Sequence, residues 1–204
     1  KFKPLLFPLT YLAPEYKALL NSWPRTRIHN CKKKLPFRDN EVSYALTSHF
    51  LEHLKKYEAE FVLREVCRVL RPGGYFRVIV PDLEIMIQKY QSRDFSFFAK
   101  FFDGNLFSDI KEMENDDSYT TDLFLAQIYP AHHVVKPSNP IRQLINRCAR
   151  WHMWMYDFKS LQRMLTQAGF KEVEKKSHGD SKIPDISGLE SHPEHSLFVE
   201  AQKL

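Results

Sequence analysis

The sequence predicts an α/β fold in which two parallel strands flank a long amphipathic helix. Residues 42–48 (VSYALTS) form a mostly apolar stretch of the kind that makes a buried parallel strand. Residues 58–70 follow as a predicted helix, and its apolar face consists of Val62, Val66, Val69 and Leu70. Tyr75–Val80 is a second apolar stretch. Strand, helix and strand within about forty residues indicate a βαβ unit with a right-handed crossover.

Short turn-forming segments separate and end the elements of this unit. Arg71-Pro72-Gly73-Gly74 is predicted as the turn between helix and second strand, because proline presets a turn and glycine supplies the positive φ of a tight reversal. Pro81-Asp82 ends the second strand. Upstream, the sequence predicts a short helix at residues 14–22 and a short strand at residues 27–31.

The middle of the chain is less regular. Leu83–Tyr90 and Phe95–Phe102 are predicted as short helices. The stretch 105–140 mixes acidic residues, a pair of histidines and several X-Pro steps. We interpret residues 83–155 as a helical cap inserted over the edge of the sheet.

Regular patterning returns near the carboxyl terminus. Asp157 is a predicted N-cap for a helix that runs to Ala168 and is stopped by Gly169. Phe170–Lys176 and Ser196–Gln202 have the patterns of two further strands, and the second of them closes the sheet.

Composition places the chain among globular proteins of one domain. Its 204 residues are 43% hydrophobic and 27% charged, and no apolar run reaches the roughly 18 residues of a membrane-spanning helix. We expect one domain over residues 1–204, in which residues 1–27 are an incomplete N-terminal segment. Three scattered cysteines predict neither a disulfide framework nor a zinc-type cysteine pair, so we expect a reducing cytoplasm. The net charge of +5 is spread out apart from Lys32–Lys34, which does not indicate a nucleic-acid partner.

Several motifs carry a family resemblance. In order, LPFRDN, VSYALTS, HFLEHL, REVCRVLRPGG and FRVIVPD resemble the second half of class I S-adenosylmethionine-dependent methyltransferases. HMWMYDFKSLQRMLTQAGF, IPDI and HSLFVEA resemble predicted bacterial methyltransferases of the methyltransferase-11-like type. The resemblance covers residues 28–204. It implies a Rossmann-like sheet, mostly parallel with an antiparallel last strand, and S-adenosyl-L-methionine as cofactor.

The resemblance also implies which residues hold the cofactor. Asn30 and Cys31 match the loop that contacts the adenine, and Thr47, Ser48 and His49 match the strand end that lines the methionine moiety. Asn30 replaces the usual acidic residue, and its amide oxygen can still accept a hydrogen bond from the adenine amino group. Ser43 is a second departure, because many relatives carry aspartate there.

The glycine-rich loop of the family is the largest departure. The first glycine is Gly73, so no G-x-G pattern precedes the predicted sheet. Three explanations stay open: the loop lies outside this chain, the proline-containing N-terminal segment replaces it, or the domain has lost activity.

Methyl transfer to a small-molecule or glycan-linked acceptor is the function that the resemblance implies. An acceptor hydroxyl or amine benefits from a nearby base, and we expect His49 to be that catalytic base. Residues expected on the acceptor side are Asp82, His132, His133 and His152. His53 is expected to have a structural role in the LEHL turn. No metal site is expected.

Two other functions were weighed against methyl transfer. The first is a catalytically degenerate, methyltransferase-like binding module, which the missing glycine loop, Asn30 and Ser43 would explain. The second is nucleic-acid methylation or binding, which only the high pI favours; TSHF stands where the N/D-P-P-Y/F signature of base-amino methylation would be needed.

Overall fold

The computed structural model describes residues 29–102, 116–129, 152–186, 188–190 and 192–204. The chain divides into two compact units, Lys1–Lys33 and Lys34–Leu204, and the first is described at residues 29–33 alone. The predicted helix at 14–22 lies outside the described residues. No helix among the described residues is long and apolar enough to cross a membrane.

The strand predicted at residues 27–31 is wrong in its described part, because residues 30–33 form a turn. The Lys33 amide donates to the Asn30 carbonyl at 2.9 Å, and the Lys32 amide donates to Asn30 Oδ1 at 3.1 Å. An asparagine side chain that bonds the backbone two residues ahead competes with strand pairing.

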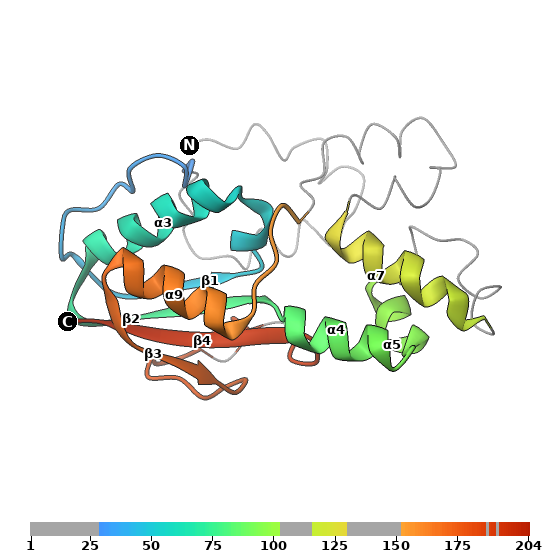
Figure 1. Cartoon of the computed structure of the whole chain (residues 1–204). Helices are drawn as coiled ribbons and strands as arrows, with labels where there is room; N and C mark the ends of the chain where they lie inside the picture. Colours follow the sequence, from blue (N-terminus) through green and yellow to red (C-terminus); the bar gives the residue numbers. More distant parts are fainter. Residues whose placement is uncertain (1–28, 103–115, 130–151, 187, 191) are drawn as a thin grey trace, which may run out of the picture. The chain divides into compact units, whose positions relative to one another are not determined.

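Four strands form one mixed sheet in the described part of the chain (Figure 1). Their order is β1 (Val42–Ser48), β2 (Leu70–Pro81), β4 (Ser196–Lys203), β3 (Phe170–Lys176). β1 and β2 are parallel, whereas β4 pairs antiparallel with both β2 and β3. β3 therefore runs in the same direction as β1 and β2. This confirms a mostly parallel sheet with an antiparallel last strand.

The junction between the helix and β2 differs from the predicted turn. The helix α3 (Lys56–Val69) ends at Val69, and Leu70 already pairs with Val42 of β1. The register then shifts, and the next pair is Tyr44 with Tyr75. Arg71–Gly74 is therefore a bulge within β2, made possible by the positive φ of Gly73 (77°).

Two helices pack side by side on one face of the sheet, α3 and α9 (Phe158–Ala168) (Figure 1). The predicted caps of α9 are confirmed: the Ser160 amide donates to Asp157 Oδ1 at 2.7 Å, and Gly169 has a φ of 104°. Both helices bury one apolar stripe, which in α9 consists of Leu161, Met164 and Leu165.

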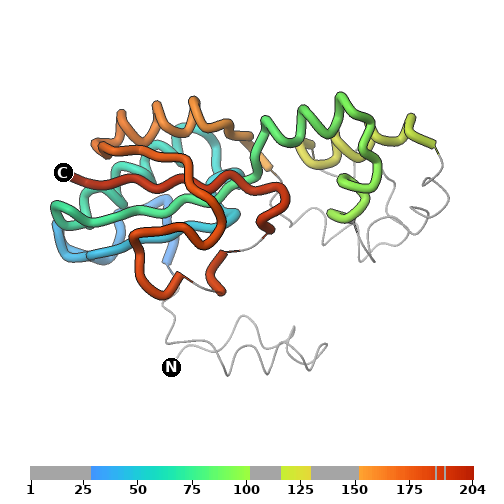
Figure 2. Tube along the Cα trace, turned by 90° about the horizontal axis from the view of Figure 1, so that it is seen from below, coloured from blue at the N-terminus to red at the C-terminus, as the bar shows by residue number. Residues whose placement is uncertain are grey.

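Five further described helices form a separate group beyond the strand ends (Figures 1 and 2). They are α4 (Leu83–Gln91), α5 (Phe95–Ala99), η2 (Lys100–Phe102), η3 (Asp117–Tyr119) and α7 (Thr120–Ile128). A small apolar core holds them together, made of Met86, Phe95, Phe97, Phe98, Leu123 and Ala126. The two helices predicted after Asp82 are thereby confirmed.

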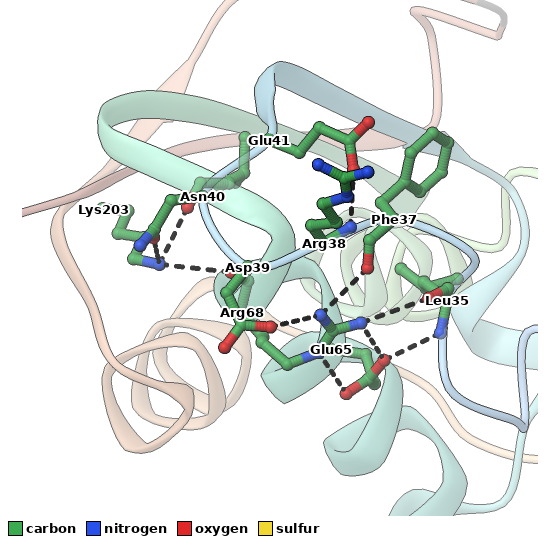
Figure 3. A network of polar contacts seen from close by, with 10 residues as sticks. Leu35, Phe37, Arg38, Asp39, Asn40, Glu41, Glu65, Arg68 and Lys203 are labelled. Atoms are coloured by element: carbon green, nitrogen blue, oxygen red, sulfur yellow. Dashed lines mark hydrogen bonds and ion pairs between the residues drawn. The ribbon is translucent and has the colours of Figure 1, made fainter.

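Arg68 of α3 fixes the loop that leads into β1 (Figure 3). Its guanidinium donates to the Leu35 and Phe37 carbonyls, at 3.2 and 3.0 Å, and to Asp39 Oδ1 at 2.6 Å. Glu65, one turn earlier in α3, accepts two further bonds from Arg68 at 2.8 and 2.9 Å. The start of β1 is therefore held against the end of α3.

Candidate functional site

A cavity of about 460 Å³ lies at the carboxyl ends of β1 and β2. Five histidines and two glutamates line it: His49, Glu52, His53, His152, His192, Glu194 and His195. Apolar side chains of the helical group, among them Met86, Phe97 and Phe101, complete the wall. The cavity thus combines titratable groups from the segments after β1 and before β4, together with His152, with an aromatic wall from the helical group.

His49 stands where β1 ends, as predicted. Its amide continues the ladder by donating to the Ile79 carbonyl at 2.9 Å, but its φ of 46° turns the chain away from the strand. The ring lies between two partners: Nε2 is 3.0 Å from Ser196 Oγ, and Nδ1 is 3.4 Å from Glu52 Oε1. The imidazole is partly exposed to the cavity and held from both sides.

Thr47 and Ser48 lie just before His49 in β1. They pair with Val78 and Ile79 of β2, which places them at the carboxyl edge of two adjacent parallel strands. Of the three predicted residues of this strand end, only His49 is among the residues that line the cavity.

Asn30 and Cys31 belong to the other compact unit. The side-chain oxygen of Asn30 accepts the Lys32 amide, as described above. The Cys31 thiol points to the His29 carbonyl, with 4.0 Å between sulfur and oxygen.

The residues predicted on the acceptor side differ in whether they line the cavity. Asp82 is fully buried and caps α4 by accepting the Glu84 amide at 2.9 Å, while Lys175 Nζ lies 3.3 Å from its other oxygen. It does not line the cavity. His132 and His133 lie outside the described residues. His152 does line the cavity, and its Nδ1 donates to the Gln127 carbonyl at 2.6 Å.

Glu52 is the residue that the sequence did not single out. It lies in the short helix η1 (Leu51–His53), its side chain is 0% exposed, and no hydrogen-bond donor of the described residues reaches either carboxylate oxygen. His53 keeps the predicted turn through its amide, which donates to the Phe50 carbonyl, yet its ring also lines the cavity. The spacing H-x-x-E-H of residues 49–53 was the available signal.

A second group of cavity residues precedes β4. His192, Glu194 and His195 offer ligand atoms within 4.8 Å of one another. Burial lowers the pKa of His195 to about 4, against the opposing attraction of Glu194. His195 is therefore neutral near pH 7, and it packs on Phe101 with a centroid distance of 4.3 Å.

With the geometry in place, the chain can be compared with known proteins. Residues 14–78, about a third of the chain, match the model of a family described as a methyltransferase domain. The matched segment includes β1, η1 and α3 and ends inside β2. It confirms the resemblance over this segment. Among curated proteins, none matches the sequence.

Solved structures, several of them described as methyltransferases, align with most of the chain at low identity. A methyltransferase of Thermotoga maritima, described as a possible histamine N-methyltransferase, is 16% identical with a TM-score of 0.41; the alignment covers 86% of this chain and 62% of that one. A Pyrococcus horikoshii protein is 16% identical with a TM-score of 0.47, over 97% and 68% of the two chains. An S-adenosylmethionine-dependent methyltransferase of Archaeoglobus fulgidus is 11% identical with a TM-score of 0.45, over 92% and 71%. Likenesses this distant carry no argument about substrate.

Proposed function

We propose that this chain, whose residues 14–78 match the model of a methyltransferase-domain family, transfers a methyl group from S-adenosylmethionine to a small-molecule or glycan-linked acceptor. The observation that supports this most directly is the cavity at the carboxyl ends of β1 and β2. Ligands of open α/β sheets bind outside the carboxyl ends of parallel strands. His49 lies at that edge and faces the cavity.

The described residues fit one side of a cofactor site. β1 and β2 are adjacent and parallel, and the hollow at their ends is not filled by side chains. Thr47, Ser48 and His49 would hold the methionine moiety. When bound, the cofactor supplies an electrophilic methyl group, so the chain's own task is to align the acceptor and exclude water.

His49 is suited to take the proton that the acceptor hydroxyl or amine gives up. The carboxylate of Glu52, 3.4 Å from Nδ1, favours the tautomer that carries its proton on Nδ1. Nε2 then keeps its lone pair and can take up a proton. This nitrogen lies 3.0 Å from Ser196 Oγ.

The predicted cap supplies the rest of the acceptor site in this proposal. Phe97 and Phe101 offer apolar surface to the cavity, and Lys100 and Gln127 offer polar groups. A mixed wall of this kind suits a small acceptor with a polar nucleophile and an apolar or sugar-like body.

Cofactor binding is the first test. Calorimetric titration of the protein with S-adenosylhomocysteine should show one binding event per chain. Ser48→Val keeps the shape of a strand residue but removes the hydroxyl at the strand end, and we expect roughly tenfold weaker binding. Thr166→Val, the same loss of a hydroxyl at an exposed position of α9, should leave the affinity unchanged.

The contrary outcome is equally clear. If millimolar S-adenosylhomocysteine gives neither heat nor a thermal shift, methyl transfer by this chain is refuted. A methyltransferase-like binding module would then account for the fold.

A further inference from the structure

The carboxylate of Glu52 lacks the partners that a buried charge requires. Its side chain is 0% exposed, and neither oxygen receives a hydrogen bond from the described residues. The nearest groups of opposite charge are the rings of His49 and His53, at 3.4 and 3.8 Å, and each is a cation only when protonated. Removing a carboxylate from water costs several kcal/mol unless a cation or donors replace the water. Glu52 therefore needs a positive charge at the cavity wall.

Two histidines lie close enough to share such a charge with Glu52. Glu52, His53 and His152 each offer one ligand atom, and these three atoms lie within 4.8 Å of one another. Ligand atoms bound at about 2.0–2.2 Å to one zinc ion lie at most about 4.4 Å apart. Small side-chain rotations would therefore bring all three into coordination distance.

The backbone holds the three ligands together although 99 positions separate His53 from His152. The amides of Met153 and Trp154 both donate to the Glu52 carbonyl, at 2.6 and 3.2 Å. The Tyr156 hydroxyl donates to the Leu51 carbonyl at 3.3 Å from a fully buried ring. The segment that carries His152 is thus fastened to η1, so the ligand set is fixed by the fold.

His152 is also in the chemical form that a metal ligand needs. Its Nδ1–H donates to the Gln127 carbonyl at 2.6 Å, which leaves the Nε2 lone pair for an ion. Histidines that bind metals commonly donate their other ring nitrogen to a carbonyl in this way.

We infer that Glu52, His53 and His152 bind a divalent transition-metal ion, with zinc as the best match. Two imidazoles and one carboxylate are a ligand set that zinc accepts in sites with an open fourth position. All three residues line the cavity, so the open position faces the space assigned to the acceptor. An ion there would neutralise Glu52 and could bind an oxygen or nitrogen atom of a molecule in the cavity.

The inference is tested by zinc binding in the absence of any methyl donor, so it can fail or succeed independently of the proposed function. Untagged protein, freed of metal by a chelator, is titrated with zinc in a calorimeter. Zinc retained after gel filtration is counted by mass spectrometry. We expect one ion per chain. We also expect at least about 100-fold weaker binding for Glu52→Gln, since even partners of metal ligands contribute 10–100-fold.

The second histidine–glutamate group supplies the matched control. Glu194→Gln makes the same isosteric change in the group of His192, Glu194 and His195, and should bind zinc as the unchanged protein does. His152→Gln provides a second removal of a ligand, with the same expected loss, in case Glu52→Gln does not fold. Thermal melting without zinc reports whether each variant is folded.

Three results would overturn the inference. The first is a protein that retains no zinc. The second is a folded Glu52→Gln or His152→Gln protein that binds zinc normally. The third is loss of binding in Glu194→Gln, which would assign the ion to the group before β4.

Discussion

At the scale of single residues, His49 combines a positive φ angle with a side chain that has contacts to two other side chains. Its φ of 46° lies in the left-handed region, which histidine, asparagine and aspartate enter more readily than other residues with a side chain. The conformation follows directly on the last β1 residue and turns the ring between Ser196 and Glu52. Strained backbone of this kind tends to occur at functional sites.

His49→Asn is the substitution that separates catalysis from folding. Asparagine tolerates the left-handed backbone, so we expect the free energy of unfolding to change by less than about 1 kcal/mol. Turnover should fall about 10²–10⁴-fold, because asparagine cannot accept the acceptor's proton. The measurements are methyl transfer to an accepted substrate and urea denaturation of the same preparations.

Ser196→Ala is the companion variant, since it removes the hydroxyl near His49 Nε2 and keeps the imidazole. It should cost far less turnover than His49→Asn. If His49→Asn lowered the free energy of unfolding as severely as it lowered turnover, His49 would instead have a structural role.

Sequence reasoning found some site residues and missed others for physical reasons. His49 was predictable because the end of a recognisable parallel strand marks the cavity edge. Glu52 was missed: the H-x-x-E-H spacing of residues 49–53 marks it, but its importance lies in burial without hydrogen-bond donors, and no local pattern encodes burial. Asp82 was expected at the cavity edge; the structure uses it as the buried N-cap of α4.

At the scale of elements, the Arg68–Glu65 pair determines how the loop before β1 joins α3 (Figure 3). Both side chains are mostly buried, with 19% and 12% exposed. Glu65 also accepts the Leu35 amide at 2.7 Å. One carboxylate thus connects a helix residue with a loop thirty positions earlier.

Glu65→Gln should lower the free energy of unfolding by about 1–2 kcal/mol at pH 7, because Arg68 loses a charge-assisted, two-bond partner. The hydrogen bonds from Arg68 hold the pKa of Glu65 below its usual 4.5. Its stabilisation is therefore complete above pH 4.5 and is lost as the pH falls through the folded-state pKa. Urea denaturation at pH 7 and at successively lower pH measures the difference between the two proteins.

Glu60→Gln is the control for this prediction, because it lies on the same helix outside the Arg68 network. It should change stability by less than about 0.5 kcal/mol. If the difference in free energy of unfolding between the wild type and Glu65→Gln stayed the same in acid, the proposed charge effect would be contradicted.

Element boundaries were predictable where the signals are local. Asp157 and Gly169 bound α9 as expected, since capping depends on residues within one turn. The bulge at Arg71–Gly74 was not predicted, because it arises from the pairing of Leu70 with Val42 across the sheet. A turn signal in sequence cannot tell a connection from a bulge within a strand.

At the scale of the whole unit Lys34–Leu204, strand order depends on groups far apart in sequence. β4 lies between β2 and β3, so the last strand of the chain occupies an interior position of the described sheet. The direction of β4 was predictable from the family resemblance. Its place was not apparent from alternating hydrophobicity, which indicates a strand but not its neighbours.

The buried residue Arg77 stabilises this strand order. It lies in β2, its side chain is 0% exposed, and it forms an ion pair with Glu190 at 2.7 Å. The guanidinium also donates to the Ser177 and Asp180 carbonyls, at 2.8 and 2.9 Å. The loop between β3 and β4 is thereby attached to β2, which supports the insertion of β4.

Arg77→Met should therefore destabilise the protein by about 3–5 kcal/mol, because it leaves the carboxylate of Glu190, 2% exposed, buried without its cation. Adding Glu190→Leu should restore much of the loss, since an apolar pair can replace a buried ion pair at little cost. Arg71→Met, at an exposed position of the same strand, should change the free energy of unfolding by less than about 0.5 kcal/mol. Urea denaturation of the four proteins measures these differences. A loss below 1 kcal/mol for Arg77→Met, or no recovery in the double variant, would mean that strand order is stabilised by apolar packing between β2 and β4 instead.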